Sequence, residues 1–228
     1  MCGRFARRST QQLLADWFDL ELEDMPWFVP SYNVAPQSVQ PVVRLNRDSG
    51  SREIALLRWG LVPFWAKNAK TGYSTINARA EEAAAKPAFR EALKKRRCLV
   101  PADAFYEWQR PAPGIDAKSK QPFAIALKSG EPYALAGLWE RWQPKEGEAL
   151  ETFTVLTTDP NELMEPIHNR MPVILEPRDY SRWLDPGDPS RPPVDLMRPY
   201  PAEKMVAWPV GERVGNVRNN DPQLLEQL

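Results

Sequence analysis

The run QPFAIALKSGEPYALAGLWERW, residues 121–142, decides which kind of fold the chain can form. It holds two mainly apolar segments of strand length, 121–127 and 133–142, around a KSGE turn at 128–131. Segments of the same character lie on both sides of it: RCLVP at 97–101, AFYEW at 104–108 and ETFTVLTT at 151–158. We therefore expect β-strands to dominate the middle of the chain.

Two further features extend this strand pattern toward the ends of the chain. VQPVVRL (39–45) and REIALLRW (52–59) flank NRDSG (46–50), which predicts a β-hairpin. KMVAWPV (204–210) predicts one last strand after a proline-rich connection over 185–201. Prolines number 24 against 11 glycines, so the strands are expected to end sharply in fixed loops.

Helices are predicted to be few and short. A capping box from Ser9 to Gln12 opens the first one. Its apolar face is predicted to hold Leu13, Leu14, Trp17 and Phe18. The other predicted helices cover 80–86, 160–166, 177–184 and a segment that starts at Pro87 and runs through 89–95. Because strands and helices do not alternate regularly, the sequence favours an α+β fold: a single domain over residues 1–228 with a mostly antiparallel, barrel-like sheet flanked by short helices.

Composition excludes several classes of protein. Hydrophobic residues make up 43% and charged residues 26% of the chain, which is typical of a globular, soluble protein. No apolar run approaches the roughly 18 residues of a membrane span, and the N-terminus does not resemble a signal peptide, so we expect an intracellular, reducing compartment. The net charge of zero argues against a strongly basic nucleic-acid binder but allows a local basic groove. With one histidine and two cysteines, we expect no metal, no cofactor and no disulfide.

Cys2 is the first candidate for chemistry because it directly follows the initiator methionine. A small terminal residue without a role, or a buried one, is one interpretation. If Met1 is removed, Cys2 instead carries a free α-amine beside its thiol, with ordinary pKa values of about 8 and about 8.5. Such an amine attacks an aldehyde to give a Schiff base, and the adjacent thiol can then close a five-membered thiazolidine ring.

Two other segments carry polar residues that suit catalysis. In AFYEW, alternation sets Phe105 and Glu107 on one face, so Glu107 either faces solvent or lies in an aromatic pocket where it can serve as a general acid or base. In TINARAEE (75–82), Asn77 and Arg79 share a face if the segment is extended. The alternative is a helix entry in which Asn77 is the cap.

His168, the only histidine, lies in EPIHNRMPVIL (165–175). A lone histidine is commonly a structural hydrogen-bonding residue. If the segment is extended, as Pro172 favours, His168 and Arg170 share a face, and an imidazole beside a guanidinium suits a phosphorylated or anionic substrate. Most of the nine tryptophans are expected in the core, but Trp65 on a proline-stiffened loop is a candidate for stacking an unpaired base.

Taken in order, many short segments resemble one family. They are MCGRF, PSYNVAPQ, RWGLVPFWAK, TINARAEEAAAKPAF, RRCLVPADAFYEW, QPFAIAL, LAGLWE, ETFTVLTTDPN, IHNRMPVIL and VGNVRNN. The ordered set, with its cysteine at the second position, is similar to the SOS-response-associated peptidase (SRAP) proteins, the abasic-site processing family. The resemblance runs from Cys2 to about Asn220.

The resemblance implies a covalent trap for abasic sites in single-stranded DNA, formed when the amine and thiol of Cys2 react with the sugar aldehyde. The family's other catalytic residues fall on Asn77, Glu107 and His168. Asn77 would position the amino terminus and sugar, Glu107 would move protons, and His168 would assist sugar opening and later reversal or β-elimination. The implied DNA contacts are Arg4, Asn33, Pro36, Trp65, Arg79 and Arg170.

The resemblance also implies binding partners, a cellular location and further activities. The expected partner is single-stranded DNA with an abasic site, including junctions with double strands, and the expected protein is a cytoplasmic monomer, associated with the nucleoid if the source is bacterial. Lyase activity and cleavage of its own Met1 are implied as well. Two positions depart from the family: Ala104 where relatives usually have glycine, and Ala66 where some relatives have a second tryptophan, which weakens the base-stacking wedge.

Two rival functions remain open from the sequence. Class II glutamine amidotransferases also begin Met-Cys-Gly, but the glycine- and asparagine-rich segments of their glutamine pocket are missing here. A non-catalytic binder of single-stranded nucleic acid would use Trp65, Arg79 and Arg170, with Cys2 incidental. Proteolysis of other proteins is not expected, because one histidine and a proton-transfer glutamate fit aldehyde capture better.

Overall fold

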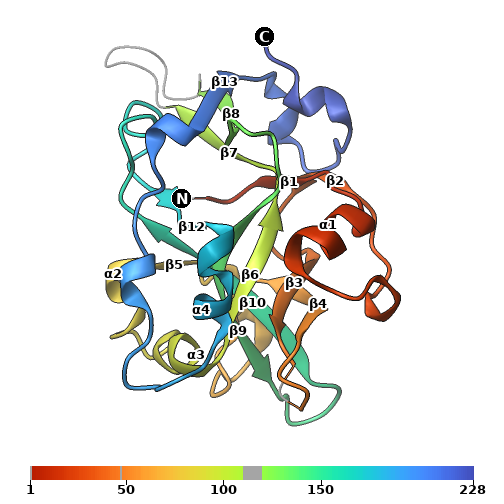
Figure 1. Cartoon of the computed structure of the whole chain (residues 1–228), viewed down its shortest axis with the longest axis vertical. Coiled ribbons are helices and arrows are strands. Elements are labelled where there is room, and N and C mark those ends of the chain that lie inside the picture. The colour runs from red at the N-terminus through yellow and green to blue at the C-terminus, as the bar shows by residue number, and fades with distance from the viewer. Residues whose placement is uncertain (1, 47, 110–119) are drawn as a thin grey trace.

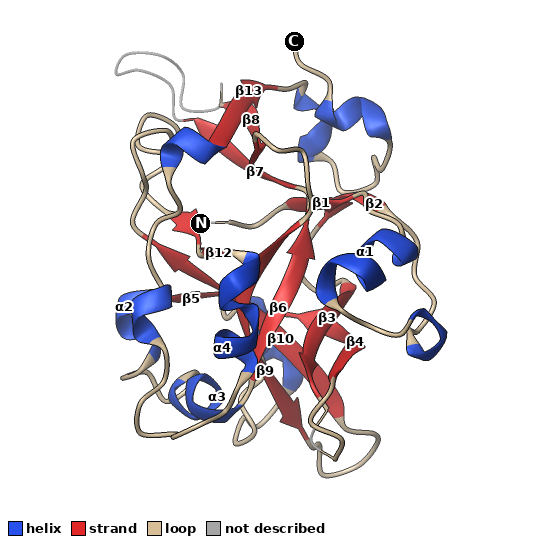
Figure 2. Cartoon of the chain, viewed as in Figure 1, coloured by secondary structure: helices blue, strands red, loops and turns tan. Residues whose placement is uncertain are grey.

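A closed ring of five strands forms the centre of the computed structural model, which describes residues 2–46, 48–109 and 120–228 (Figures 1 and 2). The ring runs β10 (Leu150–Thr158), β4 (Arg52–Trp59), β3 (Val39–Leu45), β6 (Arg97–Ala102) and β9 (Tyr133–Trp142), and β9 pairs again with β10. Only the β10–β4 pairing in this ring is parallel. The expected mostly antiparallel, barrel-like sheet is therefore confirmed.

Three short strands lie against the barrel. β5 (Asn77–Arg79) runs parallel to β10, and β11 (Met171–Pro172) runs antiparallel to the same strand. β12 (Ile174–Leu175) pairs with β9. The segments around two of the candidate residues, Asn77 and His168, are thus attached to one side of the barrel through β10.

A second, antiparallel sheet lies beside the barrel (Figure 1). Its order is β13 (Met205–Pro209), β8 (Gln121–Leu127), β7 (Ala104–Gln109), β1 (Phe5–Arg7) and β2 (Ser31–Val34). It places the start of the chain, β1, between β2 and β7, a strand from the middle of the sequence. β1 pairs with β7 through Phe5 and Phe105.

The KSGE turn forms as predicted, but it does not close a hairpin. The N–H of Gly130, at φ +72°, donates to the carbonyl of Leu127, which ends β8. β8 belongs to the second sheet and β9 to the barrel, so the turn carries the chain from one sheet to the other. By contrast, the hairpin predicted around residues 46–50 is confirmed, with Val43 of β3 opposite Ile54 of β4.

The helices are short and lie around the strands. They are α1 (Gln11–Phe18), α2 (Ala80–Ala83), α3 (Arg90–Lys95) and α4 (Tyr180–Leu184), with 3-10 turns at Leu22–Asp24, Ala69–Tyr73, Pro177–Asp179, Val194–Leu196, Ala202–Lys204, Glu212–Gly215 and Pro222–Leu225. Residues 160–166 form hydrogen-bonded turns instead of the predicted helix, and α3 begins after Pro87. Among the described helices, none combines the length and apolar character that crossing a membrane requires.

The first helix corrects the expected cap and the expected apolar face. Thr10, not Ser9, is its N-cap, because the Thr10 hydroxyl accepts from the N–H of Leu13. The Ser9 hydroxyl instead donates to Asp103 at 2.5 Å, which ties the start of α1 to the link between β6 and β7. Leu14 and Phe18 are buried, whereas Leu13 is 42% exposed.

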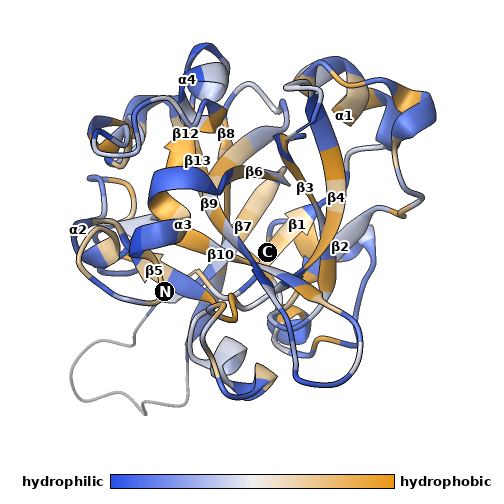
Figure 3. Ribbon diagram, turned by 90° about the horizontal axis from the view of Figure 1, so that it is seen from below, coloured by the Kyte–Doolittle hydropathy of each residue, from blue (hydrophilic) through white to orange (hydrophobic). Residues whose placement is uncertain are grey.

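Apolar side chains from both sheets form a buried cluster. In Figure 3 the hydrophobic colour is concentrated on the strands, and much of the ribbon of the loops is hydrophilic. Phe5 packs against Trp59 at 5.2 Å between ring centroids, and Trp59 stacks on Phe153. Cys2 belongs to the same buried cluster. The core of the fold therefore reaches directly to the beginning of the chain.

Candidate active site at Cys2

Cys2 is fully buried, and its backbone carbonyl accepts a hydrogen bond of 2.8 Å from the side-chain amide of Asn77. Its Sγ lies 4.0 Å from the carbonyl of Arg4. The residue is therefore fixed both by its apolar surroundings and by a side chain from a distant segment. Met1 lies outside the described residues, and its expected removal stays a prediction.

Asn77 reaches Cys2 because its segment is a strand. β5 runs parallel to β10 with Asn77 beside Val155, and the N–H of Val155 donates to the carbonyl of Ile76. The alternative in which Asn77 caps a helix is wrong, since α2 begins only at Ala80. The Oδ1 atom of Asn77 is buried and accepts no hydrogen bond from the described residues, which leaves a polar acceptor next to Cys2.

Glu107 approaches the same cluster from the second sheet. Along β7, Phe105 packs in the Cys2 cluster, whereas Tyr106 packs in a separate cluster on the opposite face. Glu107 has the same parity as Phe105 and is buried, so the solvent-facing alternative is wrong. Its carboxylate is close enough to Cys2 to influence the charge of the thiol.

His168 lies against Glu107, with its Nε2 at 3.9 Å from Glu107 Oε2. The backbone N–H of Arg170 donates to His168 Nδ1 at 3.1 Å. The carbonyl of Arg170 lies 3.2 Å from the same Nδ1, so the backbone of Arg170 holds the ring while Nε2 faces the carboxylate. The turn over 162–167 delivers the histidine to this place, and the carboxylate and imidazole form a pair suited to passing a proton.

The environment keeps the Cys2 thiol neutral. Burial, and after it the negative charge of Glu107, raises the pKa of Cys2 to about 12. A neutral thiol is a weak nucleophile, so any reaction of Cys2 at neutral pH requires a base that accepts its proton. Burial also raises the pKa of the neighbouring Tyr133 well above its usual range, so the phenol of Tyr133 stays protonated.

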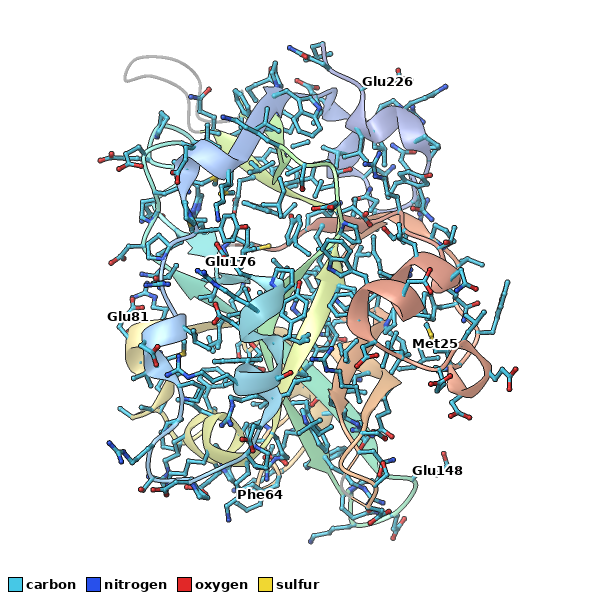
Figure 4. All side chains as sticks on the ribbon, in the orientation of Figure 1. Met25, Phe64, Glu81, Glu148, Glu176 and Glu226 are labelled. Atoms are coloured by element: carbon cyan, nitrogen blue, oxygen red, sulfur yellow. The ribbon has the colours of Figure 1, made fainter. Side chains whose placement is uncertain are left out.

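The structure separates Arg170 from His168. The Arg170 guanidinium is buried and donates to both carboxylate oxygens of Glu81, at 2.7 and 2.8 Å, and to Asp159 at 2.7 Å. Another of its hydrogen bonds reaches the carbonyl of Thr157. The two residues are therefore linked through the backbone, but the guanidinium points toward α2, where Glu81 lies on the outer surface (Figure 4).

Arg4 and Asn33 hold the end of the chain against β1 and β2. Arg4 donates to Asn33 Oδ1 at 2.7 Å and to the carbonyl of Val214 at 2.6 Å. The Asn33 amide donates to the carbonyls of Asn216 and Asn219. These bonds explain the position of VGNVRNN, and they use the polar atoms that were expected to contact DNA. Pro36, also among those residues, lies in the tight turn that follows β2.

Trp65 and Arg79 are accessible, as a DNA contact requires. Trp65 is 53% exposed, and the Arg79 side chain is 55% exposed, with Glu82 at 3.4 Å. Phe64, which the sequence reasoning missed, is 57% exposed beside Trp65 and is labelled in Figure 4. Its place next to Trp65 in a proline-led turn was the available signal. The indole of Trp142 donates to the carbonyl of Ala66 and anchors this turn.

The structure thus joins Cys2 to Asn77 and joins Glu107 to His168, with Glu107 linking the two pairs electrostatically. Within the described ranges, no group of three or more histidine, cysteine, aspartate or glutamate residues is arranged to hold a metal ion. The chemistry available from the described side chains is a buried thiol, a carboxylate and an imidazole.

Comparison with known proteins places this arrangement in a family. Residues 1–217 match the family described as SOS response associated peptidase (SRAP). The chain is 44% identical to abasic site processing protein YoqW of Bacillus subtilis, with 99% of both chains covered. It is 36% identical to abasic site processing protein HMCES of Gallus gallus, over 86% of this chain and 66% of that one.

Solved structures share the fold over most or all of the chain. A protein from Bacteroides thetaiotaomicron superposes with a TM-score of 0.84 at 27% identity, with both chains covered completely. A protein from Bordetella bronchiseptica gives a TM-score of 0.76 at 28% identity, over 92% of this chain and all of that one. The barrel and the second sheet are thus an architecture that other proteins share.

Proposed function

Because the chain belongs to the SOS response associated peptidase (SRAP) family, we propose that it captures abasic sites in single-stranded DNA through a covalent bond to Cys2. The names of its relatives, abasic site processing proteins, support this substrate. The observation that carries the proposal is the pairing of Asn77 with the Cys2 carbonyl beside the Glu107–His168 pair. These groups are the ones that an aldehyde-trapping aminothiol needs.

The proposed reaction begins with hydrolysis of the Met1–Cys2 peptide bond, which consumes a water and frees the α-amine. The amine adds to the C1′ aldehyde of the ring-opened sugar, and loss of a water gives the imine. The Cys2 thiol then adds to the imine carbon, its proton passes to the nitrogen, and a thiazolidine ring results. The product has the mass of the two reactants less one water.

Each polar residue has a proposed role in this sequence. Asn77 holds the Cys2 carbonyl and thereby fixes the direction of the α-amine. Glu107 accepts the thiol proton, which the raised pKa of Cys2 makes necessary, and returns protons during loss of water. His168, paired with Glu107, protonates the sugar oxygen during ring opening, and the same pair serves reversal or β-elimination.

We propose that DNA crosses the surface near Trp65 and Arg79. Trp65 and Phe64 offer exposed aromatic faces on which unpaired bases can stack, and Phe64 compensates for Ala66. Arg79 supplies a phosphate contact, and Arg170 reaches a phosphate only by exchanging Glu81 or Asp159 for it. Arg4, Asn33 and Pro36 shape the floor of this path. We include three further points in this proposal. The protein also binds junctions between single- and double-stranded DNA, and it acts as a monomer with a single domain. In a bacterial cell it is associated with the nucleoid.

The direct test is incubation with single-stranded DNA that carries one abasic site. Denaturing electrophoresis should show a stable protein–DNA adduct, and mass spectrometry should locate the DNA on an N-terminal peptide that begins at Cys2. Cys2→Ala should bind the DNA and form no adduct. An adduct that persists in Cys2→Ala, or an adduct on another residue, would refute the proposal, and ammonia release from glutamine would favour the amidotransferase instead.

A further inference from the structure

An apolar groove lies beside α1, on the other side of the molecule from α2. The groove has a volume of about 530 Å³ and is lined by the first turn of α1 and by Leu22, Met25, Trp27, Val29 and Pro30. Figure 4 shows Met25 at this edge and Glu81 of α2 at the opposite edge. The groove therefore lies across the molecule from α2, and we name it the Trp27 groove.

Large apolar side chains in this segment are unusually accessible. Trp27 is 79% exposed and Val29 is 59% exposed, while Leu13 and Leu22 are also exposed. An exposed tryptophan at a groove is an unfavourable surface for a chain on its own, but it is a common anchor in protein–protein interfaces. The floor is rigid, because Arg7 donates to the carbonyl of Val29 and packs over the ring of Phe28 at 4.6 Å.

The surroundings of the groove are strongly acidic. The segment 9–30 contains Asp16, Asp19, Glu21, Glu23 and Asp24 and has neither lysine nor arginine, in a chain whose net charge is zero. Within the described parts of the chain, none of these five carboxylates forms an ion pair. Their negative charge is therefore available to a partner.

A second depression continues the groove at Met25. It has a volume of about 950 Å³, and Asp19, Glu21 and Asp24 lie along it together with Glu53 and Asp185. Arg52, the basic residue of its lining, donates to the carbonyl of Phe18 and to the hydroxyl of Ser181. The apolar groove and the acidic depression thus lie next to each other, with Met25 in the lining of both.

We propose that this face binds a protein segment in which bulky apolar side chains are followed by lysines or arginines. The apolar side chains enter the Trp27 groove, and the basic side chains lie along the acidic depression. Charge complementarity selects this occupant, because DNA and anionic lipid are repelled by the same carboxylates.

Selection from a displayed library of random dodecapeptides on the wild-type protein tests the proposal. We expect the enriched peptides to combine aromatic or large aliphatic residues with a cluster of lysine or arginine. Synthetic copies should bind roughly tenfold more weakly to Trp27→Ala, and also to the double variant Glu21→Lys, Asp24→Lys. Trp65→Ala, which removes an exposed tryptophan from another part of the surface, should bind them as the wild type does.

Several outcomes would overturn the proposal. They are a library that yields no binder, binders that are acidic or uncharged, and binders that Trp27→Ala leaves unaffected. Dimerisation of the wild type that Trp27→Ala abolishes would assign the groove to a second copy of the chain instead. All three groove substitutions lie on exposed side chains, so circular dichroism should show that the variants stay folded. Crosslinking at Cys2 serves as a separate measurement of the proposed function.

Discussion

The side-chain amide of Asn77 donates a hydrogen bond of 2.8 Å to the backbone carbonyl of Cys2. This bond connects the start of the chain to a strand whose place is set by β10. Asn77→Asp exchanges the donor for a carboxylate that repels the carbonyl oxygen. We expect crosslinking of abasic DNA at saturating concentration to slow by about tenfold or more, because a hydrogen bond of about 1–2 kcal/mol is lost. DNA affinity, measured by fluorescence anisotropy, should change much less.

The control for this substitution is Asn169→Asp, which adds the same charge at an exposed position near His168. It leaves the bond to Cys2 intact and should crosslink at nearly the wild-type rate. Equal slowing in both variants would mean that charge alone, and not the position of Cys2, accounts for the effect.

Glu107→Gln should slow crosslinking by about a hundredfold with little effect on DNA affinity, because the amide cannot accept the thiol proton. The isosteric side chain keeps the packing next to Phe105, so thermal unfolding should stay near that of the wild type. Glu165→Gln, at an exposed position in the preceding turn, is the matched control. Equal losses of affinity and rate in Glu107→Gln would show that this carboxylate is structural.

Because Arg170 is paired with Glu81, we expect DNA affinity to rise when the Glu81 carboxylate is neutralised. Glu81→Gln weakens one of the two carboxylate partners of Arg170 and frees a donor for a phosphate. Tighter binding and a steeper salt dependence are expected, whereas Arg79→Ala should weaken binding and reduce the salt slope by about one. Titrations at several salt concentrations measure both, with Glu162→Gln as the control. Unchanged affinity in Glu81→Gln would exclude Arg170 from the phosphate contacts.

The buried thiol of Cys2 predicts a loss of stability in alkali. Its pKa is raised to about 12 in the folded chain, from an ordinary value of about 9, because burial and then Glu107 disfavour the thiolate. A raised pKa stabilises the folded state fully below the unfolded value, and this contribution disappears as the pH rises from about 9 toward 12. The free energy of unfolding, measured with urea between pH 9 and pH 11, within the range set by these two pKa values, should therefore fall less in Cys2→Ala than in the wild type. Parallel curves for the two proteins would contradict the burial of the thiol.

Local patterns in the sequence were sufficient for most strands, whereas for Glu107 they left a buried and a solvent-facing alternative open. The alternation in AFYEW sets Phe105 and Glu107 on one face, and both side chains are buried as the aromatic-pocket alternative required. The hairpin around residues 46–50 follows from its polar turn between apolar runs. The family resemblance, in turn, selected the four residues that meet in two pairs around Cys2.

Long-range partners set the features that the sequence did not predict. Ser9 has the side chain of a helix cap, but Asp103 binds it, and Thr10 takes the cap. The distance along the chain between Arg170 and Glu81 leaves no local signal of their ion pair. The parallel pairing of β10 with β4 closes the barrel, and no pattern in either strand specifies that partner.

The attachment of Asn77 to Val155 has a consequence for the nascent chain. The strand that carries Asn77 gains its support only when residues near 155 have left the ribosome, and the cluster around Cys2 also needs Met171. A contact can form only after both of its residues have been synthesised. The burial of Cys2 therefore comes late in translation. Throughout most of synthesis the amino terminus is therefore exposed, so removal of Met1, which the proposed function requires, can take place before folding encloses Cys2.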